Sequence, residues 1–318
     1  MATLLFDHPA GLGHDTGPYH PESPARLIAI TDALAADTFR DLGRRRSPRC
    51  DLTPIERVHP AGYVAALEAA VPDDGLTYID DDTPISHGSW EAMLHAAGGA
   101  VAAVDAVMRG EAANAFVMTR PPGHHASRTV PMGFCLLNNA AIAVRHAQAA
   151  HGAERVAIVD FDVHHGNGTQ AIFWADASVL YCSTHEMPLF PGTGAASETG
   201  TYGTIVNAPL APASDGVVFR EACESIILPR LAAFAPDAII VSAGFDAHWR
   251  DPLANLNLTE MDFAWITAEI MEIAARSAGG RVISVLEGGY DLEALGRSAA
   301  AHIATLMGLS YFSPSTGS

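Results

Sequence analysis

Short apolar runs alternate along this chain with longer segments of helical period. The apolar runs predict β-strands over residues 3–6, 115–118, 155–161, 178–182, 238–241 and 281–286. Alanine-rich segments with helical period predict α-helices over residues 89–108, 138–151, 217–234 and 260–277. Strands that alternate with helices favour an α/β fold, in which a mostly parallel sheet is covered by helices on both faces. Ligands of such folds bind beyond the carboxyl ends of the strands.

Polar side chains follow four of the predicted strands at the points where these strands end. The polar segments are residues 120–125, 160–168, 242–248 and 287–290. If the strands are parallel, all four segments lie along one edge of the sheet. This edge is therefore the predicted position of an active site.

The segment 160–168 indicates a metal site. Unpaired charge at the edge of a core costs several kcal/mol unless it is compensated, and a divalent cation compensates Asp together with His. Asp162 and His164 are two residues apart, so both side chains point the same way if the segment is extended. Asp246 is the best-placed third ligand. Two carboxylates and one imidazole leave a coordination position open, as in catalytic zinc sites, and Fe²⁺ suits the same ligands. The alternative is a hydrogen-bonded polar network without metal.

Two further motifs supply groups that can take part in catalysis. His124 and His125 follow a rigid Pro-Pro-Gly turn that can direct both rings into a cleft, as metal ligands, as acid–base groups or as part of a capped loop. Tyr290 follows Gly288 and Gly289, which permit close approach of the backbone. A phenol at this place can donate a hydrogen bond to a developing oxyanion. A purely structural tyrosine is the alternative.

Composition limits the class of protein. The chain has 318 residues, of which 49% are hydrophobic, and we expect one domain over residues 1–312 followed by a frayed tail over 313–318. The net charge of −18 argues against nucleic-acid binding and favours cationic substrates or simple solubility.

We expect no membrane span and a cytoplasmic location, because the sequence has no long apolar run and no basic N-terminal signal. The four cysteines are expected to be reduced and buried, and residues 44–46 to form a basic surface loop.

The order of the motifs resembles the histone deacetylase family, within the arginase/deacetylase fold. The resemblance covers nearly the whole chain and rests on residues 20–27, 121–125, 133–135, 160–168, 191–194, 242–246 and 287–290. The Glu-Gly-Gly-Tyr form of the last motif and Asn167 are similar to the class II branch and its bacterial relatives. Acylated lysine or another acylated amine is then the implied substrate, and a homo-oligomer is compatible with the family.

The resemblance implies a role for each residue of the motifs. The zinc ligands would be Asp162, His164 and Asp246. The catalytic groups would be His124, His125 and Tyr290, with Asp160 behind His124 and Asn167 beside His125. A narrow tunnel for the acyl-amine would be lined by Gly133, Phe134 and Phe190, with Asp82 and Leu253 at its rim. The side chains of Asp160 and Ser183 match a potassium site of the family.

The implied reaction is amide hydrolysis by a metal-activated water molecule, with Tyr290 polarising the substrate carbonyl. We expect the anionic Asp160 to hold His124 in its charged form, whereas the neutral Asn167 exerts no such effect on His125. His125 is therefore our predicted general base.

Three alternatives remain open from the sequence. An acetylpolyamine deacylase is disfavoured by Leu253, because polyamine-specific relatives place an acidic residue at this position. An arginase-like binuclear centre would need a second carboxylate where this chain has His248. A non-catalytic binder of acyl ligands is disfavoured because the expected ligands and Tyr290 are all present.

Overall fold

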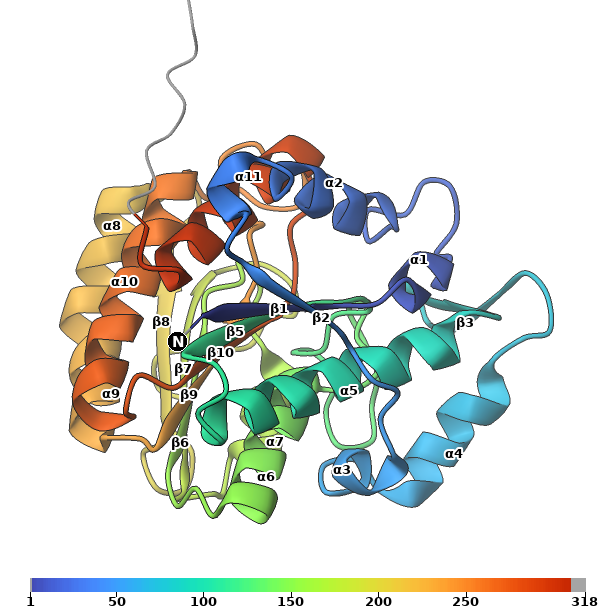
Figure 1. Cartoon of the computed structure of the whole chain (residues 1–318), viewed down its shortest axis with the longest axis horizontal. Helices are drawn as coiled ribbons and strands as arrows, with labels where there is room; N and C mark the ends of the chain where they lie inside the picture. The colour runs from blue at the N-terminus through green and yellow to red at the C-terminus, as the bar shows by residue number, and fades with distance from the viewer. Residues whose placement is uncertain (1, 310–318) are drawn as a thin grey trace, which may run out of the picture.

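The computed structural model describes residues 2–309, and they form an eight-stranded sheet covered by helices (Figure 1). The end of the predicted domain and the predicted frayed tail lie outside this range. The order of the strands is β2-β1-β5-β10-β9-β6-β7-β8, and all seven neighbouring pairs are parallel. The strands span β1 Thr3–Asp7, β2 Gly43–Arg46, β5 Asn114–Met118, β6 Val156–Asp160, β7 Val179–Glu186, β8 Ile205–Leu210, β9 Ala238–Ala243 and β10 Val282–Leu286. The predicted α/β class is confirmed.

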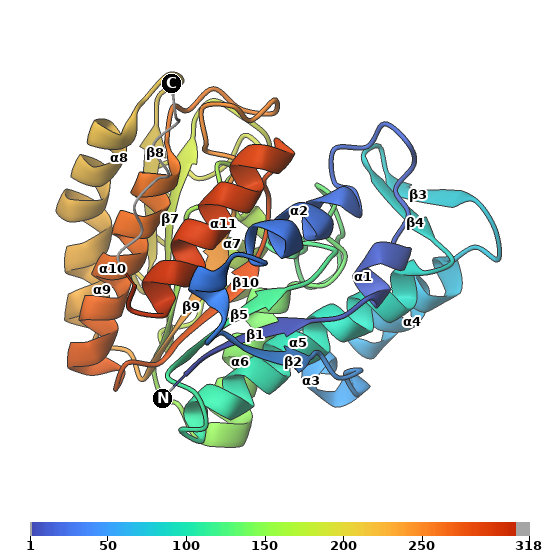
Figure 2. The same ribbon diagram turned by 45° about the horizontal axis from the view of Figure 1, so that its top comes forward.

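Helices cover both faces of the sheet (Figure 2). One face carries α2 (Ala25–Ala33), α8 (Gly216–Ala222), α9 (Leu228–Phe234), α10 (Glu260–Ser277) and α11 (Leu292–Leu306). The other carries α3 (Leu52–Glu56), α4 (Ala61–Ala70), α5 (Ser89–Met108), α6 (Asn139–His151) and α7 (Asn167–Phe173). Shorter elements are α1 (Ala10–Gly13), the 3₁₀ turn η1 (Asp37–Phe39) and the hairpin of β3 (Leu76–Asp80) and β4 (Thr83–Ser86).

Alternate residues of each strand enter two separate cores, because side chains along a strand point to opposite faces. In β6, Ala157 and Val159 belong to the core under α10 and α11, whereas Val156 and Ile158 belong to the core under α5 and α6. Burial on both faces explains why the strand is an unbroken apolar run.

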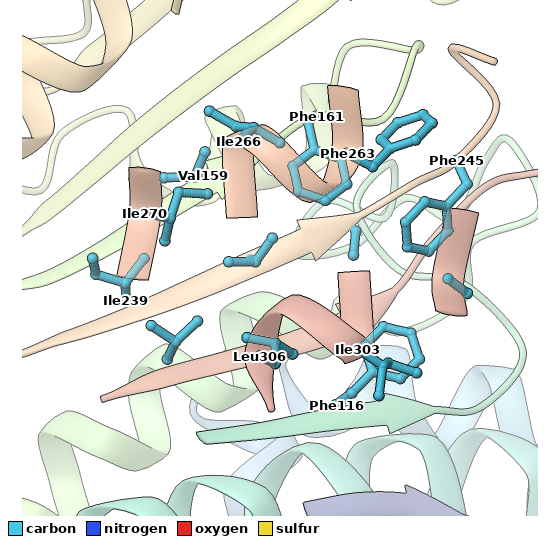
Figure 3. Close-up of a cluster of buried hydrophobic side chains, with 14 of the residues drawn as sticks. Phe116, Val159, Phe161, Ile239, Phe245, Phe263, Ile266, Ile270, Ile303 and Leu306 are labelled. Carbon is cyan, nitrogen blue, oxygen red and sulfur yellow. The ribbon is translucent and has the colours of Figure 1, made fainter. Parts of the chain in front are cut away.

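An aromatic cluster anchors the strand ends that carry the predicted metal ligands (Figure 3). Phe161 and Phe245 directly precede Asp162 and Asp246, and both rings pack against Phe263 of α10, with centroid distances of 5.8 and 5.2 Å. The three phenylalanines are at most 1% exposed. Burial of each ring contributes roughly 1.5–3 kcal/mol. The same packing that stabilises the core therefore fixes the positions of the two carboxylates.

Two local expectations were wrong, and one edge strand was not predicted. Residues 44–46 form the edge strand β2 instead of a loop, because pairing with β1 outweighs their polar character. The strand at the opposite edge, β8, contains Pro209 and was not predicted. Charged residues and proline are both typical of edge strands. The expected helix over 217–234 is divided by the π-helical turn η2 (Cys223–Ile227). Pro229 lies within the first two residues of the following helix, α9, and lacks the N–H that an uninterrupted α-helix would need there.

Two expectations from composition can be compared with the structure. All four cysteines are buried and free, as expected. Among the described residues, α5 is long and apolar enough by length and composition to cross a membrane, but 67% of its most apolar window is buried inside the protein. It packs against α6 and β5 and is a core helix of this fold.

Candidate metal centre and catalytic cavity

The structure brings Asp162, His164 and Asp246 together at the carboxyl edge of the sheet. Asp162 follows β6 and Asp246 follows β9, and these two strands are direct neighbours. The Nδ1 atom of His164 lies 3.2 Å from Oδ1 of Asp162 and 3.1 Å from Oδ2 of Asp246. The segment is a turn and not the extended strand that we expected, because β6 ends at Asp160 and the backbone N–H of His164 donates to Oδ1 of Asp162 at 2.9 Å.

The donor set fits a divalent cation. All three side chains are buried, with Asp246 fully enclosed. Burial lowers the pKa of His164, but hydrogen bonds to the two carboxylates outweigh this effect and raise its pKa to about 10. The site therefore favours positive charge strongly, and its three converging atoms suit Zn²⁺ or Fe²⁺ with an open position for a small ligand.

Two glycines leave room for these carboxylates. A Cβ atom on Gly244 would lie 2.1 Å from Oδ2 of Asp162, and one on Gly288 would lie 2.1 Å from Oδ2 of Asp246. The outer oxygens are held by the backbone, since Gly288 N–H donates to Asp162 at 2.8 Å and Val163 N–H donates to Asp246 at 2.9 Å. These contacts orient the inner oxygens towards His164.

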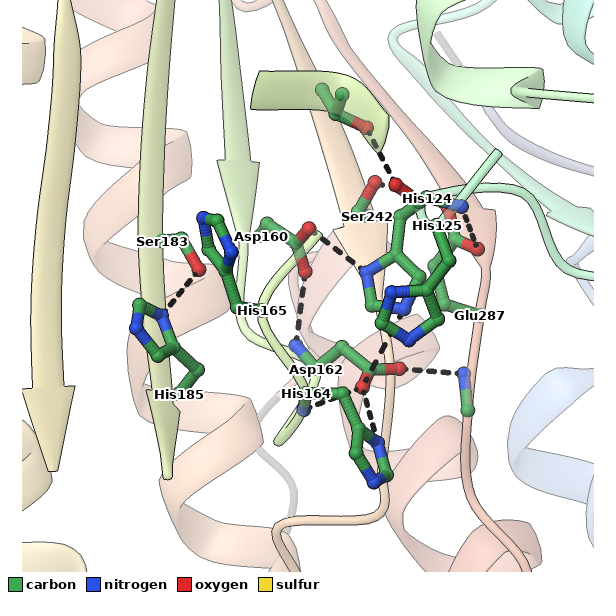
Figure 4. Close-up of polar contacts among 12 residues, drawn as sticks. His124, His125, Asp160, Asp162, His164, His165, Ser183, His185, Ser242 and Glu287 are labelled. Carbon is green, nitrogen blue, oxygen red and sulfur yellow. Dashed lines mark hydrogen bonds and ion pairs between the residues drawn. The ribbon is translucent and has the colours of Figure 1, made fainter. Parts of the chain in front are cut away.

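His124 and His125 lie beside this cluster, with ring centroids 4.0 Å apart (Figure 4). The Nδ1 atom of His124 is 3.0 Å from Oδ2 of Asp160, which also accepts a hydrogen bond from the hydroxyl of Tyr181 at 3.0 Å. Burial lowers the pKa of His124, but the charges of Asp162 and Asp160 outweigh burial and raise this pKa well above its ordinary value. A charged His124 is the expected result.

His125 has the opposite electrostatic environment. Burial, together with the neighbouring His124 and His164, lowers its pKa well below the ordinary value. The direction is the one we expected, but the cause is different: burial is the main factor, and the hydrogen bond to Asn167 acts weakly in the other direction. Because the amide of Asn167 donates to the sulfur of Met132 at 3.1 Å, its oxygen faces Nδ1 of His125 at 2.8 Å. Nδ1 of His125 is thus the donor, and its Nε2 is left as the basic atom.

A cavity of about 250 Å³ opens onto the metal cluster. It is lined by Asp82, His125, Gly133, Phe134, His164, Leu189, Phe190, Leu253 and Tyr290. Every residue expected to line the tunnel or its rim lies in this wall. Leu189 was missed, because nothing in its sequence context distinguishes it from other apolar residues beside Phe190.

Aromatic rings shape the wall of the cavity. Phe190 packs edge-on against His125 at 5.1 Å, and Phe134 packs edge-on against Tyr290 at 5.8 Å. Phe134 adopts a φ of 68°, which is unusual for a residue with a side chain and is a feature concentrated at functional sites. Asp82 lies on the turn of the β3–β4 hairpin, where its Oδ1 accepts a hydrogen bond from the hydroxyl of Thr83.

The pair that we assigned to potassium lies behind the metal cluster. Asp160 and Ser183 are opposite each other in the pairing of β6 with β7, and both are fully buried. The hydroxyl of Ser183 is 2.9 Å from Nδ1 of His185. This placement is compatible with a monovalent cation, and the identity of such an ion stays a prediction.

A buried ionic network beneath Tyr290 was missed. Glu22 contacts Arg26 at 3.0 Å and also contacts Arg120, and all three side chains are fully buried. Burial raises the pKa of Glu22, but the two guanidinium groups outweigh this and lower it to about 2. The guanidinium of Arg26 lies 5.1 Å from the centre of the Tyr290 ring. The spacing of Glu22 and Arg26 by one helical turn was the available signal.

Glu287 is a second buried carboxylate whose role was not predicted from the sequence. It accepts hydrogen bonds from the backbone N–H of Gly123 at 2.7 Å and of His124 at 3.1 Å, and from the hydroxyl of Ser242 at 3.1 Å. It therefore links three of the four polar segments and fixes the backbone of the histidine pair.

Another group of metal-ligating residue types lies between α5 and α6, at the opposite edge of the sheet. His146 and His151 both hold Oδ1 of Asp105, at 2.8 and 2.6 Å. Arg57 donates to Nδ1 of His146 at 3.1 Å, so the proton of that ring is on Nε2 and faces the carboxylate. The distances are those of hydrogen bonds, and the His146 nitrogen that faces Asp105 carries a proton, so it has no lone pair for a metal ion. The group therefore fits a hydrogen-bonded network better than a metal site.

The fold and the cavity define a class of protein. A parallel α/β sheet that carries a buried Asp–His–Asp cluster, two imidazoles and a phenol around one cavity is the arrangement of a metal-dependent hydrolase. The model of the histone deacetylase domain matches residues 20–306. The chain belongs to the histone deacetylase family and is a hydrolase of amide bonds.

Individual relatives agree with this assignment. The chain is 42% identical to the histone deacetylase-like amidohydrolase of Pseudomonas aeruginosa, over 89% of this chain and 74% of that protein. It is 41% identical to a probable deacetylase of Archaeoglobus fulgidus, over 92% of this chain and 82% of that protein. The crystal structure of the HDA15 HD domain superposes with a TM-score of 0.92 at 36% identity, covering 97% of this chain and 89% of that one.

Proposed function

We propose that this protein is a zinc-dependent deacylase that removes acetyl or related acyl groups from lysine side chains or similar primary amines. The observation that supports this most strongly is the single cavity that has His164 of the metal cluster, His125 and Tyr290 together in its wall. A base, an electrophilic hydrogen-bond donor and a cation site around one small cavity are what hydrolysis of an unactivated amide requires.

Asp162, His164 and Asp246 would hold the divalent ion. When bound, it would act as a Lewis acid that lowers the pKa of a water molecule and polarises the amide carbonyl. Nε2 of His125 accepts the proton of the attacking water while the new C–O bond forms. The hydroxyl of Tyr290 donates a hydrogen bond to the carbonyl oxygen as this atom gains negative charge.

The second half of the reaction breaks the C–N bond. His125 returns its proton to the departing nitrogen, so the products are a carboxylic acid and an amine, which exchange a proton to become a carboxylate and an ammonium group. His124, kept cationic by Asp160 and Asp162, stabilises the negative charge that develops in the site. Asn167 keeps the basic atom of His125 directed at the cavity through its hydrogen bond to Nδ1.

The wall of the cavity supports a linear acyl-amine substrate. Phe134 and Phe190 offer apolar ring surfaces to an alkyl stem, and Asp82 supplies an acceptor at the rim for the amide or ammonium group of the substrate. Leu253 lies in the same wall, where a free polyamine would gain from an acidic partner. The wall therefore suits acyl-lysine better than acetylpolyamine.

An arginase-like binuclear centre gains no support. Nε2 of His248 lies 3.4 Å from Glu260, and His248 lines a separate pocket with Trp249 and Arg250. It is therefore engaged elsewhere and does not supply a second metal ligand.

The experiment that tests the proposed function compares acetyl-lysine peptides with acetylpolyamines, using wild-type protein and Tyr290→Phe. We expect kcat/KM to be higher for the peptides and kcat to fall roughly 10²–10³-fold in the variant, as for loss of one oxyanion donor. Absence of turnover on every acylated amine, or full activity in Tyr290→Phe, would contradict the proposal.

A further inference from the structure

Asp251 lies outside the catalytic cavity but contacts two residues of its wall. It comes five residues after Asp246 and is 7% exposed. Its Oδ2 accepts a hydrogen bond from the backbone N–H of Tyr290 at 2.7 Å and a longer one from Asp291 at 3.4 Å. Its Oδ1 accepts from the backbone N–H of Leu253 at 3.0 Å. One carboxylate thus joins the loop that carries Tyr290 to the loop that carries Leu253.

The turn that carries Tyr290 depends on such anchors, because two glycines precede the phenol. Gly289 has a φ of 122°, a conformation that residues with a side chain rarely adopt. The carbonyl side of the turn is held by Arg26, which donates to the carbonyl of Gly289 at 2.7 Å. The N–H side is held by Asp251. Arg26 and Asp251 therefore hold the turn from opposite sides.

The chemistry of the anchor explains why it is a carboxylate. Three backbone N–H groups point at Asp251, and a carboxylate has only acceptor positions, whereas an amide would present an NH₂ group to at least one of these donors. Burial and the negative charge of Asp246 raise the pKa of Asp251 to about 7, and the three N–H groups act against this rise because they stabilise the ionised form.

From this geometry we infer that Asp251 is a positioning residue that sets the place of the Tyr290 phenol and, through Leu253, the shape of the cavity mouth. The inference rests on the proposed function, since it assigns to Asp251 a role in the step that Tyr290 performs. Asp251 acts through the two backbone segments and does not touch the substrate.

A double-mutant cycle tests the inference with the metal-loaded full chain. We expect Asp251→Asn to lower kcat on an acetyl-lysine peptide by about 10- to 100-fold, since displacement of a catalytic group by about 1 Å can cost roughly 10² in rate. In the Tyr290→Phe background, the same substitution should change kcat by less than about 3-fold, because the group that Asp251 positions is already absent. Equal loss in both backgrounds would overturn the inference.

A matched control is the neighbouring Asp291→Asn. Asp291 caps α11 by accepting from Ala294 N–H at 2.9 Å, a task that asparagine also performs. We expect this variant to keep kcat within about 2-fold of the wild type. If Asp291→Asn lowers kcat as much as Asp251→Asn does, any substitution in this loop reduces activity and no specific role of Asp251 is shown, so the inference fails.

A readout without substrate separates this inference from the proposed function. With 3-fluorotyrosine at position 290, the ¹⁹F resonance should shift or broaden in Asp251→Asn and stay unchanged in Asp291→Asn. If the protein hydrolyses no acylated amine, the proposed function fails, but a shifted resonance in Asp251→Asn would still support the positioning role. If the resonance is unchanged in Asp251→Asn, the inference fails and the proposed function is not affected. If Asp251→Asn does not fold, Asp251→Ser, which retains a smaller acceptor, takes its place in both measurements.

Discussion

The Nδ1 atom of His125 lies 2.8 Å from the amide oxygen of Asn167, whereas the Nδ1 atom of His124 lies 3.0 Å from the carboxylate of Asp160. Two adjacent imidazoles thus have partners of different charge. Together with burial, this difference separates their pKa values in opposite directions. Groups separated in this way are suited to different tasks, one as a fixed cation and one as a base.

The first prediction concerns this asymmetry. Asn167→Asp would place a negative charge against Nδ1 of His125, which stabilises the imidazolium and raises the pKa of His125. The base must be neutral to accept a proton, so the acid limb of the pH–kcat/KM profile should move to higher pH. Asn167→Ser, which adds no charge, should not raise it. An acid limb that stays in place in Asn167→Asp would refute the assignment of His125 as the base.

The second prediction concerns the buried ionic network. Glu22→Gln leaves the guanidinium groups of Arg26 and Arg120 buried without their carboxylate, and loss of one partner of a buried pair costs about 3–5 kcal/mol. Reversible urea unfolding at pH 7 would measure the loss. The matched control is Asp37→Asn, which removes an exposed carboxylate 3.5 Å from Arg40 and should leave stability nearly unchanged. If the free energy of unfolding falls by similar amounts in Glu22→Gln and Asp37→Asn, the burial of the network does not explain the loss of stability.

The third prediction concerns stability in acid. His302 is fully buried between Thr267 and Ser284, and burial lowers its pKa from 6.5 to about 3. In the unfolded chain this group takes up a proton as the pH falls below about 6.5, whereas in the folded protein it stays neutral down to about 3. Its contribution is therefore complete above pH 6.5 and is lost as the pH falls towards 3, by up to about 1.4 kcal/mol per pH unit.

His302→Gln should reduce the slope of unfolding free energy against pH between pH 6.5 and 5 by up to about 1.4 kcal/mol per pH unit. The exposed His87, replaced by Gln, serves as the control. His14 and His59 are also buried, with pKa values lowered to about 4 by burial, so part of the slope should persist in His302→Gln. An unchanged slope in His302→Gln would show that His302 is protonated in the folded state.

The fourth prediction concerns substrate choice. Leu253→Glu would add a carboxylate to the wall of the cavity, where a cationic amine chain can reach it. We expect kcat/KM for an acetylpolyamine to rise several-fold, with a gain that shrinks as ionic strength increases because salt screens exposed charges. Leu253→Gln is the uncharged control. A gain that is equal in both variants, or insensitive to salt, would rule out the electrostatic explanation.

Much of this molecule follows from local sequence patterns. The buried strands β6 and β9 are unbroken apolar runs, and the polar residues that follow them meet at one edge because the strands are parallel. The boundaries of α5 and α10 agree with the predicted segments, since both have long alanine-rich or amphipathic stretches and Thr259 forms a capping box with Asp262.

Other features depend on tertiary contacts that have no local signal. The arginines of β2 form a strand because β1 offers an unpaired edge, and their own preference is for solvent. The contacts of Asp251 with Tyr290 and of Glu287 with Gly123 join residues 39 and 164 positions apart. The residue types around the metal cluster are distinctive in sequence, whereas the carboxylates that hold the backbone in place resemble any other acidic residue.

The most direct test of the account is titration of metal-depleted protein with Zn²⁺, in parallel with Fe²⁺, while deacetylation of an acetyl-lysine peptide and bound metal per chain are both measured. We expect negligible activity without metal, a rise that saturates at one ion per chain, and neither tight binding nor activity in Asp246→Asn. Activity in the metal-depleted protein, or saturation only at two ions per chain, would contradict a mononuclear site built from Asp162, His164 and Asp246.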